Sequence, residues 1–223
     1  MLIILEEHMS KELFQAIHDN DREKAERLIA ANRAAASARN ETGVSALMQA
    51  RYEGRHEIVQ VLRAAAGELD LFEAATLGDV PQLRKLLAAD PALAHALSGD
   101  GFTALHLASF FAQPEAAEEL LRQGADPNAV AKNSMKVAVI NSAAASGRAD
   151  LVKLVLRAGA DPNARQQMGY TALHAAAAHD NVEMAQALLD AGADPSLKSD
   201  DGQSAGEKAG PAVAAMLEGR AKK

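Results

Sequence analysis

One pattern recurs in the C-terminal half of this 223-residue chain, at a spacing that leaves few folds open. It begins as Thr-Ala-Leu-His-x-Ala, or as Ala-Val-Ile-Asn-x-Ala in the middle copy, and it ends as Gly-Ala-Asp-Pro. The copies begin at Thr103, Ala138 and Thr171, and in each of them the aspartate follows 23 residues later. Because chance does not preserve such a separation three times, the chain is built from a repeated structural unit.

The last copy, residues 169–196, indicates how one unit folds. Thr171 suits a helix N-cap, because its hydroxyl can accept a hydrogen bond from a free backbone N–H of the first turn. The pattern predicts a short helix over 172–179 and a second helix over 182–191, with apolar residues at helical spacing. Gly192 then ends the second helix, since glycine adopts the left-handed conformation of a helix terminus at little cost.

These motifs resemble the ankyrin repeat, whose signature is Thr-Pro-Leu-His-x-Ala at a period near 33 residues. The resemblance implies an all-α solenoid of helix-turn-helix units with short β-hairpin fingers, and the alanine-rich copies are similar to those of bacterial ankyrin proteins. We expect one domain over 1–223, with a segment 1–9 before the first helix and a degenerate C-terminal cap over 201–218. Six repeats are expected to begin near residues 11, 44, 70, 102, 137 and 170.

The N-terminal half carries weaker copies in a duplicated block, 12–69 and 70–127, whose matching residues are 58 positions apart. Within each block the repeats are 34 residues apart, whereas Leu47 and Leu71 are separated by only 24. The missing residues correspond to one finger. We therefore expect a short connection between repeats two and three, and a notch in the row of fingers at that point.

Composition excludes several classes of function. The chain has no cysteine, so it forms no disulfide and no cysteine-ligated metal site. Its formal net charge is −7 and its basic residues are scattered, which disfavours nucleic acid as a partner. The sequence contains no secretory signal and no apolar run long enough to cross a membrane. We expect a cytoplasmic monomer that binds neither membranes nor nucleic acid.

The histidines give little support for catalysis. His106 and His174 occupy the same position in their repeats, where Asn141 stands in the middle copy. A residue that recurs with the repeat is expected to hold neighbouring units together by hydrogen bonds, rather than to transfer protons. No histidine or carboxylate spacing matches a metal site or a catalytic pair. We therefore expect no catalytic residue, no cofactor and no metal.

Large side chains mark a candidate binding surface. In ankyrin proteins, the resemblance implies that the hairpin tips and the ends of the first helices line the concave face, where partners bind. Phe102 and Tyr170 are expected at hairpin tips, with methionines near other tips, and the remaining candidates are expected at first-helix ends. The alternative is that these rings only cover neighbouring repeats. The predicted partner-binding residues are Tyr52, Leu77, Phe102, Phe110, Phe111, Met135, Met168, Tyr170 and His179.

The resulting hypothesis is a non-catalytic module that binds a protein partner through its concave face and fingers. Two alternatives stay open at this point. One is an accessory or protective subunit of a single enzyme, which is still a binding role. The other is an enzyme with a polar pocket that residue spacing does not reveal.

Overall fold

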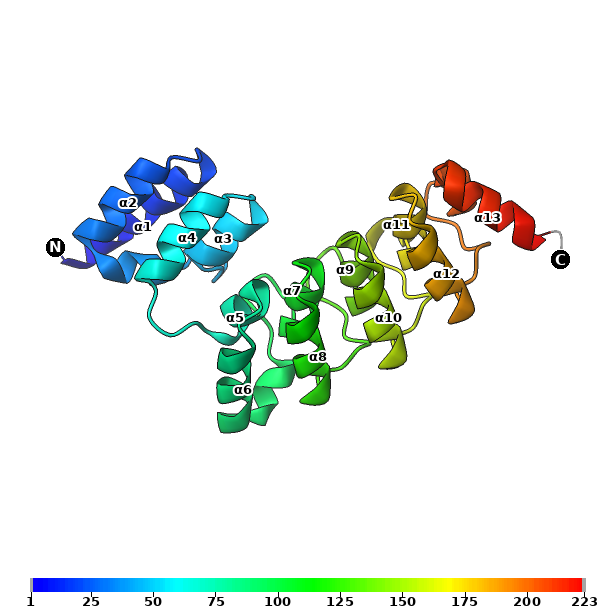
Figure 1. Ribbon diagram of the computed structural model, residues 1–223. Coiled ribbons are helices and arrows are strands. Elements are labelled where there is room, and N and C mark those ends of the chain that lie inside the picture. Colours follow the sequence, from blue (N-terminus) through cyan, green and yellow to red (C-terminus); the bar gives the residue numbers. More distant parts are fainter. Residues whose placement is uncertain (1, 222–223) are drawn as a thin grey trace.

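The computed structural model describes the backbone of residues 2–221 and the side chains of residues 8–219. Within that range the chain forms thirteen α-helices and four short 3-10 helices, and the α-helices stack as antiparallel pairs along one direction (Figure 1). The pairs are α1 (Leu2–His18) with α2 (Arg22–Ala31), α3 (Ala46–Tyr52) with α4 (His56–Ala65), α5 (Leu71–Leu77) with α6 (Val80–Ala89), α7 (Ala104–Phe110) with α8 (Pro114–Arg122), α9 (Val139–Ala145) with α10 (Ala149–Arg157), and α11 (Ala172–Ala178) with α12 (Val182–Asp190).

Both ends of the stack differ from the middle. Helix α13 (Pro211–Ala221) packs against α11 and α12 and covers the C-terminal end (Figure 1). Its first backbone N–H groups are capped by the carboxylate of Asp180, which accepts from Val213 N at 2.9 Å. At the other end, the expectation that residues 1–9 precede the first helix was wrong, because α1 begins at Leu2. No glycine or proline interrupts residues 2–18, so nothing in the sequence stops the helix from extending backwards.

The recurring histidines connect successive repeats, as predicted. In α7, the backbone N–H of Thr103 donates to His106 Nδ1 at 3.3 Å, and His106 Nε2 lies 2.9 Å from the carbonyl oxygen of Val137 in the next repeat. Because a carbonyl can only accept, Nε2 carries the proton. His174 repeats the arrangement, with its Nε2 3.1 Å from the carbonyl oxygen of Gln203. Each histidine therefore caps its own helix and also holds the following finger.

Three second helices are followed, two residues after their last residue, by a glycine in the left-handed conformation. Gly124, Gly159 and Gly192 have φ angles of 89°, 95° and 94°, a region that residues with a β-carbon rarely adopt. No other atom lies within 4 Å of the place where their β-carbons would be, so the requirement for glycine is one of conformation and not of space.

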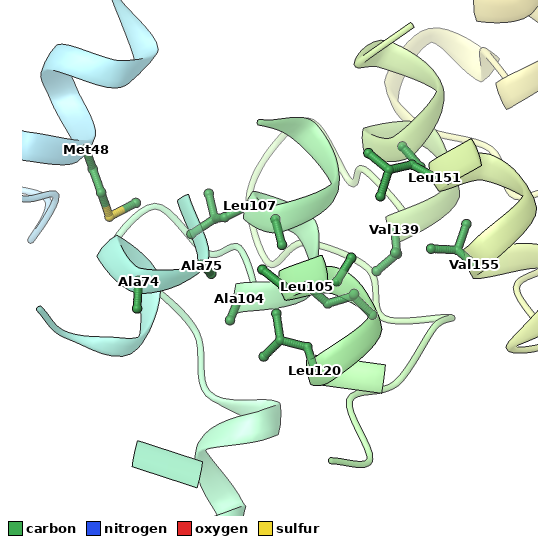
Figure 2. Close-up of a cluster of buried hydrophobic side chains, with 14 of the residues drawn as sticks. Met48, Ala74, Ala75, Ala104, Leu105, Leu107, Leu120, Val139, Leu151 and Val155 are labelled. Atoms are coloured by element: carbon green, nitrogen blue, oxygen red, sulfur yellow. The ribbon is translucent and has the colours of Figure 1, made fainter. Parts of the chain in front are cut away.

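The core is made mainly of alanine, leucine and other aliphatic side chains, and it runs along the stacked helices. Figure 2 shows Leu105 and Leu107 of α7 between Ala74 and Ala75 of α5 on one side and Val139 of α9 on the other. All of these residues are buried. Small alanines allow the helices to approach closely, and each fully buried leucine contributes about 1.5–3 kcal/mol relative to an exposed one.

The fingers are hairpins with minimal pairing. Four of them have a single antiparallel bridge in the described residues: Arg39 with Ser45, Leu97 with Thr103, Val130 with Ala138, and Lys198 with Ser204. The fifth closes through Gln166 N, which donates to Tyr170 O at 2.9 Å around a 3-10 turn, Gln167–Gly169. Backbone hydrogen bonds link neighbouring tips, such as Lys132 N to Gly101 O at 2.9 Å. The tips therefore form one continuous row.

No finger separates repeats two and three, as the spacing predicted. Helix α4 ends at Ala65 and α5 begins at Leu71. Asp70 starts α5, because its carboxylate accepts from Glu73 N while the Glu73 carboxylate accepts from Asp70 N. Arg39 of the first finger forms an ion pair with Asp70 and so holds the connection in place.

The predicted notch in the row of fingers is absent, and this expectation is corrected. The 39–45 and 97–103 fingers close over the shortened connection, and a β-carbon on Gly99 would lie only 2.0 Å from the carbonyl oxygen of Thr42. The effect of the deletion appears in the other layer of helices. In the layer of first helices α3 still packs on α5, whereas in the layer of second helices α4 and α6 diverge (Figure 1). A hollow lies between them, bridged by the Arg63–Asp79 ion pair at 3.4 Å.

Candidate functional site: an aromatic pocket between repeats two and six

Aromatic and methionine side chains from four repeats surround one pocket of about 430 Å³, which we call the aromatic pocket. It lies over the ends of α3, α7 and α9 and the fingers that precede α9 and α11. Its walls are mainly apolar. It is lined by Tyr52, Phe102, His106, Leu107, Phe110, Met135, Val137, Asn141, Ser142, Ala145, Gln166, Gln167, Met168 and Tyr170.

Three large apolar residues of the aromatic pocket are exposed to an unusual degree. Phe110 has 45% of its surface exposed, Met135 45% and Met168 57%. Met168 also has a φ of 64°, so the tip of its finger holds a methionine in a conformation that favours glycine. An apolar patch that gathers several such residues in one hollow is typical of a binding surface.

Tyr52 reaches the pocket from two repeats away. Its hydroxyl donates to Asp100 Oδ2 at 2.8 Å, and its ring centroid lies 5.4 Å from that of Phe111. Burial, and secondarily the bond to Asp100, raise the pKa of the Tyr52 hydroxyl, so it stays protonated at neutral pH. Asp100 belongs to the 97–103 finger, which lies beside the 39–45 finger. The missing finger therefore brings repeats two and four into contact here.

Phe110 and Phe111 have different surroundings although they are neighbours. Phe110 lines the aromatic pocket, whereas Phe111 lies behind it, between Tyr52 and the guanidinium of Arg51. The two phenylalanine centroids are 5.1 Å apart with an interplanar angle of 83°, an edge-to-face pair. Phe111 thus supports the wall, and Phe110 forms part of the exposed surface of the pocket.

The structure brings together most of the predicted residues, but not all. Six of the nine line the aromatic pocket, and Phe111 supports its wall. Leu77 lies elsewhere, in the hollow between α4 and α6, and His179 is an exposed residue after α11. The expectation that Phe102 and Tyr170 lie at hairpin tips was wrong. Both lie on the returning arm of a finger, because Ser98 N donates to Phe102 O and Gln166 N donates to Tyr170 O across the turn.

Sequence reasoning missed several lining residues that the repeat register could have found. Val137 occupies the position of Phe102 in the next repeat, and Ala145 occupies that of Phe110. Both are small or aliphatic, so a search for aromatic rings passed over them. Gln166 and Gln167 line the rim from a fingertip, and only the finger geometry indicates their place.

A scan against protein-family models matches ankyrin repeats in three copies, over residues 13–131, 71–166 and 132–199. The chain belongs to the ankyrin-repeat family. Its repeats account for the stacked helix pairs, the fingers and the recurring histidines described above.

Two curated relatives of this ankyrin protein are plant enzymes from Oryza sativa subsp. japonica. One is named Probable E3 ubiquitin-protein ligase XBOS31 and is 39% identical over 112 residues, which are 47% of this chain and 25% of the relative. The other, E3 ubiquitin-protein ligase XB3, is 41% identical over 95 residues, which are 42% of this chain and 21% of the relative. The chain thus spans about a quarter of the relatives' length.

Outside the aromatic pocket, the described residues form no comparable cluster of apolar side chains around a hollow. Among residues 8–219, no group of three or more histidine, aspartate or glutamate side chains is placed to hold a metal ion. A larger hollow over repeats one and two is lined mainly by polar and charged residues, among them His18, whose Nδ1 lies 3.7 Å from Glu53 Oε2. In the part of the chain that the structure describes, no helix is both long enough and apolar enough to span a bilayer.

Proposed function

We propose that this ankyrin-repeat protein is a non-catalytic binding module, and that the aromatic pocket receives an apolar side chain of a protein partner. The observation that carries the proposal is the gathering of six predicted residues around one pocket, with Phe110, Met135 and Met168 exposed in its walls. Aromatic and methionine residues are enriched where interfaces have their most important contacts. Burying such a side chain contributes about 1.5–3 kcal/mol to binding.

The described residues favour binding over catalysis at this pocket. Its ionisable side chains are engaged in structural hydrogen bonds. His106 bonds to Thr103 and Val137, and the Tyr52 hydroxyl donates to Asp100. The Tyr170 hydroxyl accepts from Lys208 Nζ at 2.5 Å. Burial lowers the pKa of His106, which keeps the imidazole neutral, and its Nε2–H donates to the Val137 carbonyl oxygen. A general acid or base needs a proton that it can exchange with a substrate.

The names of the plant relatives do not transfer to this chain. Both are named as ubiquitin ligases, but the chain covers only about a quarter of their length. What the comparison supports is a shared repeat architecture, which is used for binding in many proteins with different activities. A role as an accessory subunit of one enzyme is consistent with the same pocket. We further propose that the protein acts in the cytoplasm and is a monomer. Light scattering at micromolar concentration tests the oligomeric state, and microscopy of the tagged protein in its native cell tests the compartment.

Site-specific photo-crosslinking tests the proposed function. A benzophenone amino acid replaces Phe110, and in a second variant Met168, in the native cell; a third variant carries it at Glu118, which is exposed on α8 in the other helix layer. We expect the same partner to be crosslinked from positions 110 and 168 but not from 118. The purified partner should then bind Phe110→Ala at least tenfold more weakly. Equal crosslinking from all three positions, or unchanged affinity, would contradict the proposal.

A further inference from the structure

Arg51, the penultimate residue of α3, has surroundings unlike those of the arginines near it. Its guanidinium carbon lies 4.7 Å from the centroid of the Phe111 ring, and its Nε is buried without a hydrogen-bond partner. Within the described residues it has no carboxylate partner. Arg39, Arg55 and Arg63, by contrast, each form an ion pair with an aspartate or a glutamate.

An unpaired, half-buried guanidinium is costly, because burial removes water from a charge and no protein group replaces it. The pKa of Arg51 is lowered by this desolvation, and no neighbouring carboxylate raises it. At the same time the stack on Phe111 fixes the plane of the guanidinium. A carboxylate that arrives from outside meets a cation whose desolvation and orientation costs have already been met by folding, so a charge-assisted pair forms efficiently there.

Arg51 is connected to the aromatic pocket through Phe111. Phe111 touches Arg51 on one side, and on the other sides Tyr52 and Phe110, which both line the pocket. The relevant separations are 4.7 Å from guanidinium to ring and 5.1 Å from ring to ring. Since an extended chain advances about 3.3–3.6 Å per residue, a side chain in the pocket and a carboxylate at Arg51 are about two or three residues apart.

The finger that carries the pocket residue Met135 also carries positive charge. Lys132 and Lys136 flank Met135 on the 130–138 finger, and both are exposed without a carboxylate partner among the described residues. No acidic residue lines the pocket among the described residues, and Asp100, which contacts the lining residue Tyr52, is bonded to Tyr52 and Ser98. The surroundings of the pocket are therefore locally basic on a chain whose formal net charge is −7.

We propose that Arg51 is a carboxylate-binding residue next to the aromatic pocket, and that the partner is a polypeptide segment with an acidic side chain two or three residues from a large apolar one. The proposal rests on the binding role proposed above and adds the partner's chemistry to it. The carboxylate comes from an aspartate or glutamate within the segment and not from a chain end, because open concave surface continues beyond the pocket over repeats one and two.

Random peptide segments displayed with Gly-Ser spacers on both sides test this, since they offer side-chain carboxylates only. The baits are the wild-type protein and the variants Arg51→Ala, Arg51→Lys, Phe110→Ala and Arg157→Ala. Arg157 is the matched control, an exposed arginine at the end of α10 in the other helix layer. Thermal unfolding of each variant establishes that it is folded before selection.

We expect the wild type and Arg157→Ala to enrich segments with a large apolar residue and an acid at fixed spacing. Arg51→Ala should keep the apolar preference and lose the acidic one, and it should bind an enriched peptide about tenfold more weakly, which equals about 1.4 kcal/mol. Replacing the peptide's acid by its amide should weaken binding to the wild type but not to Arg51→Ala. Arg51→Lys should restore part of the loss, since it keeps the charge without the planar fork.

The remaining outcomes separate the two proposals. Enrichment of apolar segments without an acidic preference, or an acidic preference that persists in Arg51→Ala, overturns the role of Arg51 and leaves the pocket as a binding site. Enrichment only from a second library with free C-termini overturns the side-chain source of the carboxylate. If Phe110→Ala selects the same peptides as the wild type, the proposed function fails, and the role of Arg51 fails with it.

Discussion

Gly99 and Gly43 lie against each other although a whole repeat separates their fingers. A β-carbon added to Gly99 would be 2.8 Å from the Cα of Gly43 and 2.0 Å from the carbonyl oxygen of Thr42. This contact exists because the chain omits the finger between repeats two and three, so the fingers on either side close the space. The same closure lets Tyr52 reach Asp100 and forms the first wall of the aromatic pocket.

Gly99→Ala is therefore expected to destabilise the protein. The added methyl group meets backbone atoms, which cannot move aside without separating the two fingers, and overpacking of this kind costs about 1–3 kcal/mol. Gly67→Ala is the matched control, because no atom lies within 4 Å of its β-carbon position and the change should stay within about 0.5 kcal/mol. Urea unfolding measures both. Equal effects at the two glycines would show that the fingers do not touch in solution.

Repeat five offers a stabilising substitution. Its first helix, α9, has Ala138 as its N-cap residue and therefore no side-chain cap, and the Oδ1 atom of Asn141 is buried without a partner. In the repeats on both sides, Thr103 and Thr171 occupy the same position as Ala138 and are equally buried. Ala138→Thr should therefore fit and raise the free energy of unfolding by about 1 kcal/mol, and Thr171→Ala should lower it by a similar amount. A destabilising Ala138→Thr would mean that this repeat has no room for a cap.

The repeats themselves could be read from the sequence, because their spacing and their terminal residues determine local structure. The 23-residue separation from Thr171 to Asp194 predicts two short helices, and the deletion after Leu47 predicts the missing finger. The consequence of that deletion could not be read in the same way. Whether the neighbouring fingers separate or close depends on contacts between distant backbone segments, such as Gly43 with Gly99, which no local pattern encodes.

The candidate site was predictable to a similar extent. Rings at the ends of first helices and before them gather in one pocket because the repeat places equivalent positions side by side. Leu77 failed to join them, since the divergence of α4 from α6 leaves it facing a different hollow. Nothing in the sequence pattern distinguishes Arg51 from the other arginines. The role proposed for it rests on its stack against the Phe111 ring and on the absence of a carboxylate partner among the described residues.

His106 should make stability depend on pH. Burial lowers its pKa below the ordinary value of 6.5, so the unfolded chain binds a proton more readily than the folded one. The stability from the neutral imidazole is fully present above pH 6.5, and it is lost as the pH falls towards the folded-state pKa. His106→Asn, the residue that repeat five has at this position, should flatten the pH dependence of urea unfolding between pH 7.5 and 5. An unchanged slope would contradict the burial of a neutral His106.

Phe110 and Phe111 are expected to separate binding from folding. Phe110 is 45% exposed, so Phe110→Ala should cost less than about 1 kcal/mol of stability. Phe111 packs between Arg51, Tyr52 and Phe110, so Phe111→Ala should cost about 2–3 kcal/mol, somewhat less than a fully buried ring.

Affinity should depend more on Phe110 than on Phe111, although Phe110 contributes less to stability. Phe110→Ala removes a ring that a partner touches, and the affinity for a crosslinked partner or an enriched peptide should fall about thirtyfold, or about 2 kcal/mol. Phe111→Leu keeps an apolar group behind the wall and should lose little of either property. Calorimetric titration measures the affinity of each variant, and thermal unfolding measures its stability. If Phe110→Ala destabilised the protein as much as Phe111→Ala and left affinity intact, the ring would be a packing residue, and the aromatic pocket would lose its main contact surface.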